Sequence, residues 1–141
     1  MAPKLLVVDD DENIRNLLEA MLGALGCEVI TAENGTHALE LVELNQFDMI
    51  LLDLMMPGLS GIGVLKMLKD NPDTSEIPVV LVTAIDGSDE IMSGYQHGAT
   101  YYITKPFNPD QIVYAIDLAL APAEEKEAVS YTHLRAHETN V

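Results

Sequence analysis

The sequence predicts one α/β domain in which a parallel sheet is covered by helices on both faces. Short apolar runs without polar alternation recur along the chain, which is typical of strands buried on both sides. Segments whose apolar residues have helical spacing lie between these runs. At 141 residues, the chain is long enough for one domain with a core but too short for two ordinary domains.

The first half of the chain begins with the apolar strand Leu5–Val8. Apolar residues then follow helical spacing over residues 14–25, and Gly26 stands where a left-handed cap would end that helix. The short segment 27–31 is the second predicted strand, and a helix follows over residues 34–42. Strands and helices therefore alternate from the start.

The second half continues the alternation. Strand Met49–Leu52 leads into Asp53 and stops at Pro57-Gly58, and Ser60 is placed to cap a helix over residues 62–68. The remaining elements are a strand over 78–82, a helix over 89–97 weakened by Gly94, a strand over 100–103, and a helix to Leu120 that opens with a capping box at Asn108 and Gln111. Five strands alternating with five helices favour a parallel sheet.

The composition excludes several classes of function. A formal net charge of −16 repels phosphate backbones and anionic lipids, so we expect no direct nucleic-acid or membrane partner. No run approaches the roughly 20 apolar residues that span a bilayer, and no signal peptide is recognisable. Cys27 is the single cysteine, so an intramolecular disulfide is impossible. We expect a cytoplasmic protein.

Polar residues follow four of the predicted strands, where the strands meet one edge of the sheet. They are Asp9-Asp10-Asp11, Asp53, Thr83-Ala84 and Lys105-Pro106. Crowded carboxylates repel one another, so some must be protonated or share a cation, and hard oxygen ligands suit Mg²⁺ or Mn²⁺. Together with a lysine and a hydroxyl, they form a receptacle for a phosphoryl group on a nucleophilic aspartate.

Each of these residues also has a simpler interpretation when it is taken alone. Asp53 could cap a helix, and residues 9–12 could simply favour the positive end of the first helix dipole. Lys105 could be a surface lysine and Thr83 a loop hydroxyl. Only the convergence of all four groups on one edge favours a phosphoryl site.

Four segments resemble the receiver domain of bacterial two-component response regulators. They are Val7–Asp10, Leu52–Gly58, Val82–Ala84 and Lys105–Phe107. The resemblance covers about residues 4–121. It implies a flavodoxin-like (βα)5 sandwich with a parallel five-stranded sheet in the order 2-1-3-4-5.

The resemblance also implies a metal site next to the phosphoacceptor. Asp53 would accept the phosphoryl group, and Asp9 and Asp10 would be the acidic pair that holds Mg²⁺, with Asp10 most directly on the ion. Asp53 itself and the backbone carbonyl of Met55 would complete the protein ligands. Asp11 would have a minor, indirect role.

The remaining matches imply a switch. Thr83 and Lys105 would each bind a phosphoryl oxygen, Ala84 would leave room beside Thr83, and the bond from Lys105 to Pro106 would be cis. Tyr102 would be an aromatic switch that turns inward after phosphorylation. The face made by the fourth helix, fifth strand and fifth helix would then signal.

The implied function is that of a phosphoacceptor signalling domain, not an enzyme with a separate substrate. Its partners would be a sensor histidine kinase or histidine phosphotransferase, and a downstream target protein or an output domain. The alternatives are the receiver of a truncated multidomain regulator or hybrid kinase, and a receiver-like module that only binds. A flavodoxin-type or nucleotide-binding domain is disfavoured, because it needs a glycine- or hydroxyl-rich loop after the first strand and this chain has three aspartates there. An aspartyl-phosphate phosphatase is also disfavoured, because it needs a second acid two residues after the nucleophile and that residue is Met55.

The chain divides into a receiver over residues 1–122 and a tail over 123–141. The tail begins like a linker. Residues 129–139 resemble the in-frame translation of a transposon-type adapter used in sequencing libraries, so we expect them to be non-native. A short disordered native tail is the alternative.

Overall fold

The computed structural model describes residues 2–84 and 87–120, so the predicted tail over 123–141, with its adapter-like segment, lies outside the described residues. The strands are β1 (Lys4–Val8), β2 (Glu28–Ala32), β3 (Met49–Leu52), β4 (Val79–Thr83) and β5 (Tyr101–Thr104). The helices are α1 (Glu12–Ala24), α2 (Gly35–Leu44), α3 (Gly61–Asp70), α4 (Ser88–Gln96) and α5 (Pro109–Leu120). The predicted alternation is confirmed.

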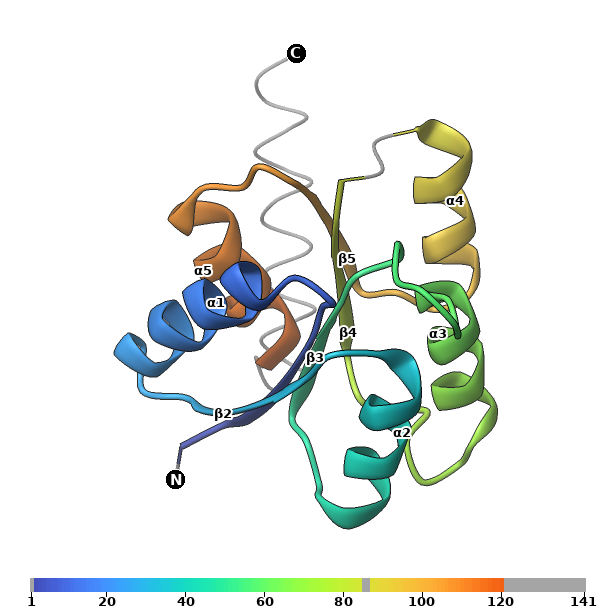
Figure 1. The fold of residues 1–141 in the computed structure, drawn as a ribbon, viewed down its shortest axis with the longest axis horizontal. Helices are drawn as coiled ribbons and strands as arrows, with labels where there is room; N and C mark the ends of the chain where they lie inside the picture. The colour runs from blue at the N-terminus through green and yellow to red at the C-terminus, as the bar shows by residue number, and fades with distance from the viewer. Residues whose placement is uncertain (1, 85–86, 121–141) are drawn as a thin grey trace, which may run out of the picture.

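All strand pairs are parallel, and the sheet has the order β2-β1-β3-β4-β5. Helices α1 and α5 cover one face of the sheet, and α2, α3 and α4 cover the other (Figure 1). The strand order reverses between β1 and β3, which is where ligands bind in open α/β sheets. The predicted flavodoxin-like fold is confirmed.

Three strands, β2, β4 and β5, begin one residue later than the sequence pattern suggests. The N–H of Cys27 donates to the carbonyl oxygen of Leu22 at 3.1 Å and so belongs to the end of α1. Gly26, with φ at 90°, makes the left-handed turn that this cap requires. Pro78 has no N–H to donate to a neighbouring strand, and β4 starts at Val79.

Side chains at the helix starts satisfy backbone N–H groups, as the sequence indicates. Ser60 accepts from the N–H of Gly63 at 3.1 Å. Asn108 and Gln111 exchange hydrogen bonds of 2.9 and 3.1 Å between backbone N–H groups and side-chain oxygens, which is the predicted capping box. These contacts fix where α3 and α5 leave the loops that surround the carboxyl edge of the sheet.

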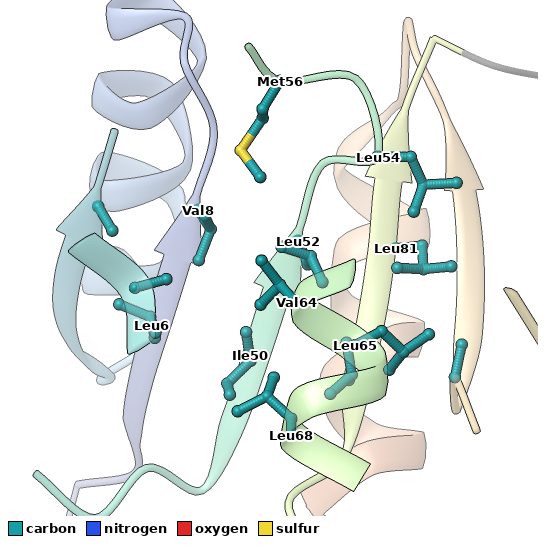
Figure 2. Close-up of a cluster of buried hydrophobic side chains, with 14 of the residues drawn as sticks. Leu6, Val8, Ile50, Leu52, Leu54, Met56, Val64, Leu65, Leu68 and Leu81 are labelled. Atoms are coloured by element: carbon teal, nitrogen blue, oxygen red, sulfur yellow. The ribbon is translucent and has the colours of Figure 1, made fainter. Parts of the chain in front are cut away.

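The core lies in two layers because alternate residues of each central strand point to opposite faces. One cluster packs Leu6, Val8, Ile50 and Leu52 against α3 (Figure 2). The other packs the intervening residues of β1 and β3 against α1 and α5. Full burial on both faces explains why these strands lack polar alternation.

One lysine connects two loops at the amino edge of the sheet. The Nζ of Lys69, in the last turn of α3, donates to the carbonyl oxygens of Ser75 at 3.0 Å and Ile77 at 2.8 Å. Its stem runs beneath Gly98, which has a φ of 102°. Burial lowers the pKa of Lys69, and the nearby charge of Glu76 opposes that shift. The α3–β4 and α4–β5 turns are thus held together.

No helix in the described part of the chain combines the length and apolar character that crossing a bilayer requires.

Helix α3 begins directly against the strand end that carries the phosphoacceptor candidate. A methyl group added at Gly61 would overlap the carbonyl oxygen of Asp53 and the Cα of Leu54. We therefore predict that Gly61→Ala lowers the free energy of unfolding by about 1–3 kcal/mol, because backbone atoms must move. Urea denaturation followed by circular dichroism measures this.

The matched control is Gly23→Ala in α1, where an added methyl group would meet no atom within 4 Å. It should raise the free energy of unfolding by about 0.5–1 kcal/mol through helix propensity. Equal effects at both glycines would contradict the close packing of α3 on β3.

Candidate functional site

The backbone places Asp9 and Asp53 side by side beyond the ends of β1 and β3. The N–H of Asp9 donates to the carbonyl of Ala32 at 3.1 Å, and that of Asp53 donates to the carbonyl of Val8 at 3.0 Å. Both bonds extend the sheet's pattern by one residue. Both side chains are buried, with exposed fractions of 3% for Asp9 and 5% for Asp53.

Three carboxylates gather at this edge. Asp9, Asp10 and Asp53 each offer an oxygen, and these oxygens all lie within 4.8 Å of one another. Asp10 is the exposed member. Asp11 points elsewhere, because its side chain caps α1 by accepting from the N–H of Asn13 at 2.9 Å. The structure thus unites the three predicted carboxylate ligands and gives the fourth acid a capping role.

Lys105 supplies the positive charge for the two buried carboxylates. Its Nζ lies 2.7 Å from Asp9 Oδ2 and 3.3 Å from Asp53 Oδ2. Its backbone N–H donates to the carbonyl of Thr83 at 2.8 Å, which joins the ends of β4 and β5. The bond from Lys105 to Pro106 is cis, as the resemblance implied.

The site holds more negative than positive charge. Burial raises the pKa of Asp9, and the charge of Asp53 adds to this, whereas hydrogen bonds from Lys105 and the backbone of Asp11 oppose it without cancelling it. Burial alone lowers the pKa of Lys105, but its hydrogen bond to Asp9 and the charges of both carboxylates outweigh burial and raise it. One ammonium group cannot compensate three carboxylates.

The donor set fits a small divalent cation. Carboxylate oxygens without histidine or cysteine are the ligands preferred by Mg²⁺ and Mn²⁺. The three oxygens converge from two adjacent strand ends, and one of them faces solvent. The backbone carbonyl of Met55 stays a predicted fourth protein ligand.

Thr83 and Tyr102 lie on the same face of the sheet, next to the acidic cluster. Thr83 is the last residue of β4 and is fully buried, and Ala84 behind it is exposed. Tyr102 is half-buried and pairs in register with Leu81, two residues before Thr83. Because side chains two apart share a face, Thr83 and Tyr102 are diagonal neighbours on adjacent strands.

Two contacts in the site escaped the sequence-based prediction. The guanidinium of Arg15 donates to the backbone carbonyl of Asp9 at 2.8 Å, which fixes the loop before α1. The N–H of Met55 donates to Asp53 Oδ1 at 3.0 Å, so one carboxylate oxygen of Asp53 is oriented by the backbone. The sequence did contain a signal for Arg15, because it is a basic residue one turn into a helix that follows three acids.

Comparison with known proteins identifies the family. Residues 5–117 match the family model described as the response regulator receiver domain. The chain belongs to this family. It is a receiver domain of two-component systems, which is a signalling domain, and receiver domains bind Mg²⁺ at an acidic pocket such as this one.

Curated relatives of this receiver are longer proteins. It is 46% identical over 115 residues to the response regulator PleD of Caulobacter vibrioides, covering 82% of this chain and 25% of PleD. It is 35% identical over 135 residues to the DNA-binding transcriptional regulator NtrC of Escherichia coli, covering 96% of this chain and 28% of NtrC. The chain therefore spans about a quarter of these relatives.

Solved structures agree with the fold of the receiver. The chemotaxis protein CheY4 of Vibrio cholerae superposes with a TM-score of 0.81 at 30% identity, over 85% of this chain and 100% of that one. A response regulator from Chloroflexus aurantiacus gives 0.83 at 33% identity, over 86% of this chain and 100% of that one.

Removing the ammonium group from the site should destabilise the metal-free receiver. In Lys105→Met, two buried carboxylates would face each other without their cation, and the free energy of unfolding should fall by about 3 kcal/mol. Urea denaturation in the presence of EDTA measures this. The double variant Lys105→Met/Asp9→Asn should recover part of the loss, and an unchanged stability in the single variant would contradict the role of the ion pairs.

Proposed function

We propose that Asp53 accepts a phosphoryl group from a phosphohistidine of a sensor histidine kinase or histidine phosphotransferase. One observation carries the proposal: Asp53 is buried, close to two further carboxylates and 3.3 Å from an ammonium group. The phosphohistidine ring is protonated at its other nitrogen; a carboxylate oxygen of Asp53 attacks phosphorus, the bond from phosphorus to the imidazole nitrogen breaks, and the histidine leaves as neutral imidazole that keeps this proton. Water later hydrolyses the acyl phosphate slowly at the same site.

Asp9, Asp10, Asp53 and the backbone carbonyl of Met55 are the residues proposed to hold Mg²⁺. When bound there, the ion would neutralise charge on the transferring phosphoryl group. The acidic cluster alone repels phosphate. Because its member Asp10 is exposed, solvent would reach an ion held there.

Lys105 and Thr83 are proposed to bind the phosphoryl oxygens. Lys105 already contacts the acceptor carboxylate, so it can follow the negative charge from Asp53 to the new phosphoryl group. Phosphorylation adds roughly −1.5 to −2 charges, which attracts the ammonium group and the threonine hydroxyl. Ala84, the small residue that follows, leaves the phosphoryl group room beside Thr83.

The switch is proposed to run along one face of the sheet. Movement of Thr83 toward the phosphoryl group opens space beside its diagonal neighbour Tyr102, whose ring then turns inward. Gly94 of α4 packs on both Leu81 and Tyr102, since a methyl group there would lie 3.7 Å from the tyrosine ring. The α4–β5–α5 face therefore changes shape when Asp53 is modified.

A downstream target protein or an output domain is proposed to respond to that change, in the cytoplasm. The relatives support an output domain, because a DNA-binding transcriptional regulator and PleD each extend well beyond the matched part.

Phosphorylation itself is the direct test. Incubation with acetyl phosphate and Mg²⁺ should add the mass of one phosphoryl group, detectable by intact-protein mass spectrometry, and Asp53→Asn should add none. Asp48→Asn, at the opposite edge of the sheet, is a matched control that should gain the group normally. Equal gain in Asp53→Asn, or no gain in the unchanged protein, would overturn the assignment and favour a module that only binds.

Metal binding gives a second prediction. Saturating Mg²⁺ should stabilise the receiver by about 2.7 kcal/mol at a concentration one hundred times the dissociation constant, seen as a higher thermal midpoint. Asp10→Asn should lose most of this gain because it removes a ligand. Asp11→Asn should keep it, since asparagine also caps α1 and the metal ligands are intact. Equal losses in both variants would indicate general charge screening instead of a site.

A further inference from the structure

Tyrosines from three elements gather over the edge strand β5. Tyr101 of β5 and Tyr114 of α5 form a tilted ring pair, with centroids 5.3 Å apart. Tyr95 of α4 lies close to both rings. Burial raises the pKa of the Tyr95 hydroxyl, and the nearby hydroxyls of Tyr101 and Tyr114 raise it further. A hydrogen bond with the backbone of Tyr102 opposes this rise. Tyr95 thus reaches over β5, which Figure 1 shows between α4 and α5.

This aromatic group is accessible and has a carboxylate on each side along α5. Tyr95 is 42% exposed, and Met92, one turn before it on α4, is 59% exposed. Asp110 and Asp117 are exposed and stand four residues before and three residues after Tyr114, so they are its neighbours on the helix surface. We name these residues the tyrosine surface; they are Met92, Tyr95, Tyr101, Asp110, Tyr114 and Asp117.

The tyrosine surface lacks positive charge of its own. Over residues 88–120 the sequence contains four acidic residues and, among lysines and arginines, Lys105 alone. That lysine is engaged with Asp9 and Asp53 at the carboxyl edge. Two copies of the surface would therefore bring like charges together, which disfavours a symmetric dimer through this face.

We propose that the tyrosine surface binds an arginine-bearing segment of a partner protein. A planar guanidinium group stacks on tyrosine rings and pairs with a carboxylate at the same time, whereas a lysine ammonium does only the second well. Along α5 the ring of Tyr114 stands between two acids, Asp110 and Asp117, and the ring of Tyr101 on β5 lies beside it, which matches this combination. This inference states which kind of partner the α4–β5–α5 face binds. It rests on the proposed function only where phosphorylation of Asp53 would control that binding.

Binding of designed peptides tests the inference. The probes are three fluorescein-labelled helical peptides of twelve residues that differ only in carrying arginine, lysine or glutamate at every fourth position. Fluorescence anisotropy at 0.15 M salt should show tightest binding of the arginine peptide, weaker binding of the lysine peptide and none of the glutamate peptide. Amide shifts in ¹⁵N NMR spectra should map to α4, β5 and α5.

Matched variants separate the surface from the overall negative charge. Asp117→Asn and Tyr114→Leu should each weaken the arginine peptide about three- to fivefold, as expected for one exposed ion pair or one stacking contact. Asp70→Asn, which removes the same charge from the C-terminal end of α3, outside the tyrosine surface, should leave binding unchanged. If Tyr114→Leu does not fold, Asp110→Asn/Asp117→Asn replaces it, because both positions are exposed.

Three results would overturn the inference. They are equal affinity for arginine and lysine, an equal loss in Asp70→Asn, and sedimentation that shows a dimer dispersed by Asp117→Asn. Measuring the peptides on Asp53→Asn as well keeps the two proposals apart. If Asp53→Asn still binds the arginine peptide, the tyrosine surface is supported even when phosphorylation of Asp53 fails. If Asp117→Asn loses the peptide but is phosphorylated normally, the loss is due to the tyrosine surface and leaves the proposed function untouched.

Discussion

Crowding of negative charge at the carboxyl edge of the sheet is the constraint on which the rest of this receiver depends. Parallel β1 and β3 are hydrogen-bonded neighbours, so the residues that follow them cannot be far apart. Asp9 and Asp53 are buried there with Asp10 beside them, and a single ammonium group from Lys105 touches the two buried ones. The site is thereby prepared for more positive charge, and its chemistry follows from that imbalance.

The sheet also provides a short route along which the proposed switch could reach α4. Thr83, Leu81 and Tyr102 share one face because they are two residues apart or directly paired. Gly94 brings the α4 backbone close enough to touch the last two. From the sequence alone, Gly94 only weakens α4. In the fold, its lack of a side chain allows α4 to contact β4 and β5 closely.

Much of the fold and site could be predicted from sequence because the signals were local. Apolar runs, caps such as Ser60 and acids after strands needed no knowledge of tertiary contacts. The predicted start of β2 was one residue too early, because the N–H of Cys27 donates to the C-terminal end of α1 and is not available to the sheet. Arg15 and the approach of Tyr95 over β5 depend on how distant elements pack, and side-chain periodicity carries no information about that.

The contacts of Lys69 and Gly98 distinguish the two ends of α4. The stem of Lys69 lies close to Gly98, at the end of α4 nearest the amino edge. There the N–H groups of Ala99 and Thr100 donate to the carbonyl oxygens of Gly94 and Val79 and hold this end of α4 to the sheet. The opposite end of α4 starts at Gly87 without a side-chain cap. Helix α4 has nine residues and is about 13.5 Å long, so its end beside Gly98 lies at the opposite edge of the sheet from Asp53. Under the proposed switch, a small displacement beside Thr83 would move the Gly87 end of α4 farther than the end beside Gly98, and the amino edge of the domain would keep its shape.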